Sequence, residues 1–423
     1  MAEGDARSRT NWAGNVAFGA RDLYRPSSLG QLQALVAHAG PRQPIRVLAA
    51  GHSFGDLADS PGAQVSLAGL PPEVSVDPAA RLARVAAGLS YAELAGRLDE
   101  AGFALANLAS LLNISVAGAT ATATHGSGAA NQNLAATVSG LTLVTADGDV
   151  VDLCRGDDGF EGAVVHLGAL GVVVSLILEL VPSFEVSQRV YENLPLGALD
   201  DHFTEVMTSG YSVSLFTDWR APRLTQLWIK QRRDAPVTRE PWFTATPAPA
   251  ARNPVPGASP DACTGQLGVP GRWYDRLPHF RPERRPGAGH ELQSEYLLPV
   301  AHAVPALHAL DQIRDRLAPV LRTCEVRVVA ADQLWLSPCY RQDSVAFHFT
   351  WIAEAGPVLP VVALAERQLD PFGARPHWGK IFTTAPETLR ERYERLPDFL
   401  RLMDRYDPAG KFRNAYTARH LGS

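Results

Sequence analysis

The sequence predicts an α+β protein built from two domains. Short stretches with the alternation of a strand lie between helical patterns, but they do not follow the regular strand–helix–strand order of a parallel sheet. No G-x-G-x-x-G motif opens the chain after its first strand, which argues against a Rossmann fold. The length of 423 residues exceeds what one ordinary core accommodates. We therefore expect a first α+β unit over residues 1–183 and a second domain of a different kind.

The first unit alternates helices with short strands. Ser27 and Ser28 can cap a helix that continues to about residue 39. A helix over 91–101 should end at Gly102 in a left-handed cap. An apolar strand leads into a turn at 49–51, and the segment 145–149 has the composition of a hairpin turn. The other expected strands are 64–67, 74–76, 82–86, 141–144, 150–153 and 171–180.

The second half contains a hairpin, a long loop and three helical patterns. The expected hairpin strands are 211–217 and 224–230, the loop rich in Pro and Gly is 235–289, and the helices lie near 304–317, 361–369 and 386–406. Two further strands, 323–328 and 346–351, lie between the first and second of these helices. They carry most of the polar side chains that point to chemistry.

Alternation places polar side chains on one face of each of these two strands. Thr323, Glu325 and Arg327 share a face of the first strand, and His348 and Thr350 share a face of the second, with apolar residues behind them. Side by side, the strands would present a carboxylate, a guanidinium, an imidazole and a hydroxyl on one surface. A surface that simply meets water is an equally good interpretation of the spacing.

Composition describes a soluble globular protein. The chain is 46% hydrophobic and 20% charged, and its net charge of −5 weighs against a nucleic-acid surface. Residues 1–10 lack the apolar core of a signal peptide, and no run has the length of a membrane span. The four cysteines form no close pairs, which is typical of buried free thiols in a reducing cytosol. We expect a cytoplasmic protein without a nucleic-acid, membrane or metal partner.

The turn at 49–55 allows several interpretations. Gly51-His52-Ser53-Phe54-Gly55 matches the G-x-S-x-G elbow of serine hydrolases, with Ser53 as the nucleophile. The same residues fit a glycine turn that cradles a nucleotide phosphate and presents His52 to a cofactor. The hydrolase interpretation needs a regular helix directly after the turn, where Pro61 interrupts the pattern. His52 and Asp56 as metal ligands would lack a third partner.

Two other stretches have unusual composition. Residues 106–130 consist mostly of small and hydroxyl side chains, which fill little volume but leave backbone N–H groups accessible to a ligand. A flexible linker is the alternative, although Leu111, Ile114 and Val116 argue against it. The loop 376–380 adds a histidine and a lysine.

Together these pieces resemble the FAD-dependent oxidases of the vanillyl-alcohol-oxidase type and, within that family, the alditol (polyol) oxidases. The stretches that carry the resemblance occur in family order over nearly the whole chain. They are Asn11-Trp12-Ala13-Gly14-Asn15, Ala50-Gly51-His52-Ser53-Phe54, Ser115-Val116-Ala117-Gly118, Thr124-His125-Gly126-Ser127-Gly128, 211–219, Cys324-Glu325-Val326-Arg327, His377-Trp378-Gly379-Lys380 and Asp407-Pro408-Ala409-Gly410-Lys411-Phe412.

The resemblance implies the fold and the cofactor. It implies a p-cresol-methylhydroxylase-like FAD-binding domain over 1–183, an antiparallel-sheet substrate (cap) domain over 184–390, and a segment 391–423 that returns to the first domain. His52 would carry FAD through the flavin 8α-methyl, as a single covalent link because no cysteine precedes Cys154. The other cofactor contacts would be Val47, Leu48, Ala49, Ala50, Gly51, Ser53, Ser110, Ser115, Gly118, Thr122, Ala123, Thr124, His125, Val173 and His377.

The resemblance also implies an activity. Ser110, Glu325, Arg327, Thr350 and Lys380 would bind a polyol, whose only recognisable groups are hydroxyls. Lys380 and Arg327 would bind and polarise the terminal hydroxyl, with His348 close by. A primary alcohol would become an aldose while O2 is reduced to H2O2. We expect a monomer. A sugar-lactone or other alcohol oxidoreductase of the same flavin family is the main alternative.

Overall fold

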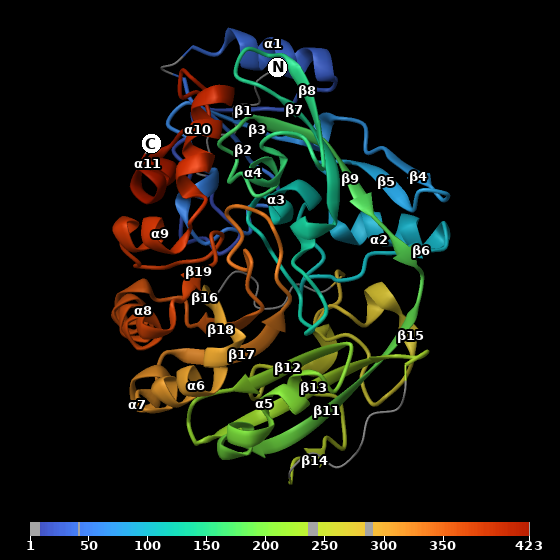
Figure 1. Ribbon diagram of the computed structural model, residues 1–423, viewed down its shortest axis with the longest axis vertical. Coiled ribbons are helices and arrows are strands. Elements are labelled where there is room, and N and C mark those ends of the chain that lie inside the picture. The colour runs from blue at the N-terminus through green and yellow to red at the C-terminus, as the bar shows by residue number, and fades with distance from the viewer. Residues whose placement is uncertain (1–8, 41–42, 236–243, 284–290, 423) are drawn as a thin grey trace.

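Two antiparallel sheets, one in each half of the chain, carry most of the fold (Figure 1). The computed structural model describes residues 9–40, 43–235, 244–283 and 291–422. Its helices and antiparallel sheets confirm the α+β class. The two sheets belong to separate hydrophobic clusters, so each half has a core of its own.

The first half contains a small parallel sheet and a larger antiparallel one. The parallel sheet has the order β1 (Asp22–Tyr24), β3 (Ala63–Val65), β2 (Ile45–Val47). The antiparallel sheet has the order β4 (Val74–Asp77), β5 (Leu82–Ala86), β9 (Val172–Glu179), β7 (Val138–Val144), β8 (Val150–Cys154). The helices are α1 (Leu29–His38), α2 (Tyr91–Glu100), α3 (Val116–Ala121) and α4 (Phe160–Val164), and β6 (Phe103–Ala104) pairs with β10 (Val181–Pro182).

Local signals fixed the ends of the first two helices. Ser28 caps α1 by accepting a hydrogen bond from Gln31 N, as its sequence position predicts. Ser90 and Glu93 form a reciprocal capping box at the start of α2. Gly102, just beyond the end of α2, has φ +82°, which confirms the left-handed conformation expected there.

The second half is organised around a sheet with nine strands in the described residues. Its path is β14 (Thr246–Pro247), β11 (Glu185–Pro195), β13 (Arg223–Arg232), β12 (Ser212–Thr217), β17 (Leu321–Val329), β18 (Ser344–Trp351), β16 (Leu292–Pro299), β19 (Arg375–Pro376), and β15 (Gly271–Arg272) pairs with β11. The helices α5 (Leu199–Met207), α6 (Ala303–Asp311), α7 (Arg314–Leu317) and α8 (Ala355–Leu369) share a core cluster with its apolar side chains. The other face of β16, β17 and β18 carries polar residues.

The C-terminal helices pack on the first half of the chain. These helices are α9 (Pro386–Arg392), α10 (Leu396–Tyr406) and α11 (Ala415–Leu421), and they lie beside N-terminal elements in Figure 1. Lys411 Nζ donates to Ala146 O at 2.7 Å and to Val36 O at 3.1 Å. We propose that the domain boundaries lie at 183/184 and 390/391. These contacts support it, although Trp273 and Trp378 from the middle segment also join the first core.

Some expected elements differ from the structure. The pattern near 304–317 is two helices, α6 and α7, and the pattern at 386–406 breaks between α9 and α10. Pro397 lies at the N-terminus of α10, where its missing N–H costs nothing, so it starts a new helix instead of continuing α9. The strands β11 and β16 and the helix α5 were not expected. The described part of 235–289 is mostly loop, as predicted, with two-residue strands and single 3₁₀ turns.

Candidate active site

One cavity of about 750 Å³ runs between the two halves of the molecule. It extends from the turn at 47–53, past the small-residue stretch, to the polar face of β16, β17 and β18. Its volume is in the range of a site for a cofactor together with a substrate. Every site residue predicted from the sequence lines it except Ala123, which is buried between the lining residues Thr122 and Thr124.

The turn that presents His52 is held from two sides. Trp12 N donates to Gly51 O at 2.8 Å, and the Trp12 ring stacks on the His52 ring at 5.1 Å between centroids. From the other side, Phe54 N donates to Gly379 O at 2.8 Å. Gly51 has φ +67°, a conformation that favours glycine. The N-terminal segment and the loop that bears Lys380 therefore both meet at this turn.

The turn is not a hydrolase elbow. After Gly55 the chain makes only the 3₁₀ turn Asp56–Ala58, and no α-helix follows before β3. A nucleophile elbow requires a helix directly after the serine. The hydrolase interpretation of Ser53 is therefore wrong.

The small-residue stretch forms a wall of the cavity. Ser115 caps α3 and accepts a hydrogen bond from Gly118 N at 3.2 Å. A Cβ at Gly118 would lie 2.6 Å from Ser115 Oγ, so a side chain there would displace the hydroxyl that caps α3. Thr122 Oγ1 and Thr124 Oγ1 are hydrogen-bonded at 3.1 Å. The stretch is an ordered surface of backbone and hydroxyl groups, and the linker interpretation is wrong.

Strand pairing brings the polar side chains together. His348 on β18 is paired with Glu325 on β17 and with Glu295 on β16, so the three form a row across the sheet. Arg327 lies two residues along β17, and Lys380 comes from the loop after β19. We call Glu295, Glu325, Arg327, His348 and Lys380 the polar cluster.

Glu295 is the centre of one half of the polar cluster. Its Oε2 accepts from Lys380 Nζ at 2.8 Å, and its Oε1 accepts from Arg327 Nη2 at 2.5 Å and lies 3.3 Å from His125 Nε2. Burial alone would raise the pKa of Glu295, but Lys380, His125 and Arg327 outweigh it and hold that pKa well below its usual value. Burial lowers the pKa of Lys380, while Glu295 opposes this shift.

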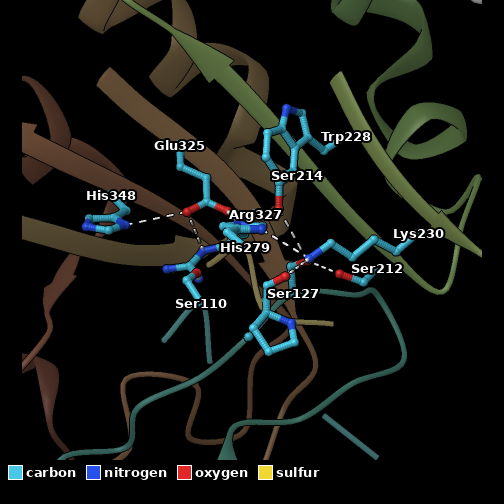
Figure 2. A network of polar contacts seen from close by, with 12 residues as sticks. Ser110, Ser127, Ser212, Ser214, Trp228, Lys230, His279, Glu325, Arg327 and His348 are labelled. Atoms are coloured by element: carbon cyan, nitrogen blue, oxygen red, sulfur yellow. Dashed lines mark hydrogen bonds and ion pairs between the residues drawn. The ribbon is translucent and has the colours of Figure 1, made fainter. Parts of the chain in front are cut away.

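Glu325 is the centre of the other half. Its Oε1 lies 2.7 Å from His279 Nε2, and its Oε2 lies 3.6 Å from Arg327 Nε and 3.5 Å from His348 Nδ1 (Figure 2). Burial would raise the pKa of Glu325, but Arg327 and His279 hold it well below its usual value. Glu325 and Arg327 are each 3% exposed, so the interpretation that this face meets water is wrong.

His348 is a neutral imidazole that lines the cavity. Burial and the neighbouring Lys380 lower its pKa to about 4. Its Nε2 is buried and has no hydrogen-bond partner among the described residues. Such a nitrogen can exchange a hydrogen bond with a hydroxyl that enters the cavity.

Comparison with known proteins places the chain in a family. A model described as "FAD binding domain" matches residues 21–153, and one described as "D-arabinono-1,4-lactone oxidase" matches residues 290–420. An alditol oxidase of Streptomyces sp. (strain IKD472 / FERM P-14339) is 52% identical, over 96% of this chain and 97% of that protein. The chain belongs to the vanillyl-alcohol-oxidase type of FAD-linked oxidases. The L-gulono-1,4-lactone dehydrogenase of Mycobacterium tuberculosis (strain ATCC 25618 / H37Rv) is 32% identical, over 98% of this chain and 99% of that protein.

A solved structure confirms the fold of this family. Cholesterol oxidase from B. sterolicum has a TM-score of 0.78 with this chain at 14% identity, and the match covers 97% of this chain and 96% of that one. The protein is therefore an FAD-dependent oxidoreductase, as the resemblance implied. The cavity fits such a cofactor, because the backbone and hydroxyl groups of its small-residue wall can approach phosphates and rings closely.

Three buried side chains of this site were not predicted from the sequence. Glu295 could have been found, since alternation over 292–298 places Gln293 and Glu295 on one face of a strand. His279 follows a proline in an irregular loop, where no periodicity exists to signal it. Lys230 was included in an expected strand but given no role.

Three findings bear on metals, membranes and thiols. No group of three or more His, Cys, Asp or Glu side chains within the described ranges could hold a metal ion. In the same ranges, no helix has both the length and the apolar character that crossing a membrane requires. All four cysteines are free, and Cys154 is exposed where a buried thiol was expected.

Proposed function

We propose that this FAD-dependent enzyme is an alditol oxidase that converts a primary hydroxyl of xylitol, sorbitol and similar polyols to the aldehyde of an aldose, with O2 reduced to H2O2. The polar cluster carries the proposal. It offers several charged donors and acceptors in one buried cavity. The 52% identity to an alditol oxidase supports it independently.

The cluster suits a substrate that has only hydroxyl groups. Glu325 can accept hydrogen bonds, Arg327 and Lys380 can donate them, and Ser110 and Thr350 can do both. Ser110 Oγ lies 3.4 Å from Arg327 Nη1, so these two groups act on the same part of the cavity. A polyol would bind through this set, because each hydroxyl needs a donor and an acceptor when it leaves water.

In the proposed reaction, Lys380 and Arg327 bind and polarise the terminal hydroxyl. Burial lowers the pKa of Lys380, which favours loss of its proton, and Nζ would take up the hydroxyl proton. When bound, FAD supplies the redox chemistry by accepting the hydride and passing the electrons to O2. His348 Nε2 would accept a hydrogen bond from a hydroxyl and help to orient the carbon chain.

We further propose that His52 holds FAD through one covalent bond to the flavin 8α-methyl. The stacking of Trp12 on His52 and the fixed turn beneath it support this, because they orient the imidazole within the cavity. Cys154, the only cysteine in residues 1–183, does not line the cavity, which supports a single link. After acid precipitation the flavin should stay with the polypeptide, whereas the His52→Ala variant should release it.

The substrate proposal is tested by a peroxide-coupled screen. Xylitol and sorbitol should give H2O2 and the matching aldoses, while aldonolactones and simple alcohols react more slowly. The lactone-oxidase match over 290–420 favours a second candidate, an aldonolactone oxidoreductase. Faster turnover of lactones than of alditols would select that candidate and contradict ours. Reduction of the flavin by xylitol without H2O2 would show an acceptor other than O2.

Two broader proposals accompany the activity. The free cysteines, including exposed Cys154, support a cytoplasmic location, because reducing compartments preserve thiols. We also propose that the protein is a monomer. Light scattering of the purified protein should give the mass of one chain, and a dimer mass would contradict the second proposal.

A further inference from the structure

A buried lysine behind the polar cluster has no role in the reaction proposed above. Lys230 lies on β13, and its side chain reaches the network shown in Figure 2. Only 1% of this residue is exposed. A charged group so deeply buried is costly unless its surroundings satisfy it. Its neighbours therefore indicate what it does.

The ammonium group of Lys230 has three acceptors. Nζ donates to Leu277 O, to Pro278 O at 3.2 Å, and lies 3.1 Å from His279 Nδ1. A protonated lysine has three N–H donors and no acceptor. The two backbone carbonyls can only accept, and the third donor then points at His279. Burial lowers the pKa of Lys230 to about 7, and below that pH the protonated Nζ donates to Nδ1 of His279, which then carries no proton.

The state of Nδ1 decides what His279 presents to Glu325. Burial and the nearby Lys230 charge lower the pKa of His279 to about 4, so the ring is neutral and has one N–H. With Nδ1 unprotonated, that N–H is on Nε2, which donates to Glu325 Oε1 at 2.7 Å. The ring is fixed edge-to-face against Trp228 and Phe216, at 5.2 and 5.6 Å between centroids.

We propose that Lys230 is a positioning residue that keeps His279 as a neutral Nε2–H donor and thereby leaves Glu325 its full negative charge for a substrate hydroxyl. Oε1 of Glu325 accepts the hydrogen bond from His279. Oε2 lies beside Arg327 and His348, which line the cavity. This inference rests on the proposed function only where it assigns Glu325 to the substrate.

Removing the lysine should change the protonation of His279. Lys230→Met removes the N–H that faces Nδ1 of His279, so this nitrogen is left able to take up a proton. The positive charge that opposed protonation of the ring is also gone. An imidazolium at His279 would neutralise Glu325 and weaken its acceptance of a substrate hydroxyl. A merely structural lysine would alter stability but not this protonation pattern.

The first test is spectroscopic and needs no turnover. The holoenzyme labelled with 15N-histidine is studied at about pH 6, between the pKa values of about 4 for His279 and about 7 for Lys230. Nitrogen–hydrogen correlations should show His279 protonated at Nε2 and unprotonated at Nδ1, with signals assigned by their loss in His279→Gln. In Lys230→Met, Nδ1 should gain a proton. A protonated Nδ1 in the wild type overturns the inference even if the variant fails to fold.

The second test is a double-mutant cycle on xylitol kinetics. Lys230→Met should raise KM about tenfold, as expected when one charged hydrogen bond weakens, with a smaller change in kcat. In the His279→Gln background the same substitution should have little effect, because Lys230 acts through the imidazole. An equal rise of KM in both backgrounds overturns the inference.

Lys411→Met is the matched control. Lys411 is also buried among backbone carbonyls, but these belong to Val36 and Ala146 in the first half of the chain. It should lower stability while the His279 signals and the KM for xylitol stay unchanged. Should the protein not oxidise alditols at all, the proposed function fails, whereas the protonation of His279 still tests the Lys230 assignment.

Discussion

At the scale of single residues, charge compensation explains the site. Glu295 and Glu325 are almost fully buried and remain ionised because cations and N–H donors surround each carboxylate. The same burial lowers the pKa of Lys380, and the neighbouring carboxylate of Glu295 opposes this shift. The site therefore combines acceptors that stay charged with a lysine that can give up its proton.

Lys380→Met tests the proton acceptor. Proton transfer by a positioned side chain typically contributes about 10²- to 10⁴-fold to a rate, so kcat on xylitol should fall by a factor in that range. Stopped-flow measurement of flavin reduction would locate the loss in the first half-reaction. Lys411→Met should leave that rate unchanged. Full turnover by Lys380→Met would remove the role that we assign.

Glu325→Gln tests the hydroxyl acceptor. Replacing the carboxylate weakens buried hydrogen bonds to the substrate and should cost about 1–3 kcal/mol, which corresponds to a rise of about 5- to 150-fold in KM. Steady-state kinetics on xylitol measure it. Glu366→Gln is the control, because Glu366 bonds Tyr296 and Thr383 and does not line the cavity. An unchanged KM in Glu325→Gln would place the substrate elsewhere.

At the scale of elements, strand register assembles the cluster. Glu325, His348 and Glu295 lie in one row only because β17, β18 and β16 pair in the observed register. If a strand slipped by one residue against its neighbour, its polar side chain would point into the apolar core instead of the cavity. The turn before His52 works similarly, since its direction depends on a positive φ at Gly51.

Two glycine substitutions with opposite expected effects on stability test the role of the turn. Gly51→Ala would meet no atom closer than 3.8 Å, so its cost of about 1 kcal/mol should come from the left-handed backbone alone. Gly96→Ala, in the middle of α2 with open space around it, should stabilise by about 0.5–1 kcal/mol. Urea unfolding measures both. Equal effects at the two sites would contradict this account of the turn.

The sequence alone anticipated much of the secondary structure and most of the site. The patterns were local: a cap at Ser28, a glycine after α2, and alternation in β17 and β18. Glu295 was missed although its strand alternates, because β16 follows a long irregular segment and was not recognised. His279 could not have been found, since only the folded loop carries it to Glu325.

At the scale of the whole molecule, segments far apart in the chain close the cavity. The turn at 47–53, the sheet of the second half and the loop after β19 contribute facing walls. The C-terminal helices then pack against the first core, so the first and last described helices lie in the same half (Figure 1). Several histidines are buried when these segments pack together, and burial keeps them neutral.

Acid should destabilise the folded protein between about pH 6.5 and 4. Burial lowers the pKa of His166 from 6.5 to about 4, so the unfolded chain binds this proton first as the pH falls. Stability is then lost across that window, by up to about 3 kcal/mol for His166. Urea unfolding of His166→Asn, which keeps an acceptor for Gly168 N, should show a weaker pH dependence. The exposed His38→Gln should behave as the wild type, and an unchanged slope in His166→Asn would contradict the prediction.

The sequence by itself determined many of the helices and strands, which faces of β17 and β18 are polar, and the family, because these follow from local spacing and from motifs. The tertiary structure decided that the polar face is buried and that Glu295 and His279 join it. It also gave Lys230 its three acceptors. Those facts depend on strand order, loop path and burial, which bring together residues that no local pattern relates.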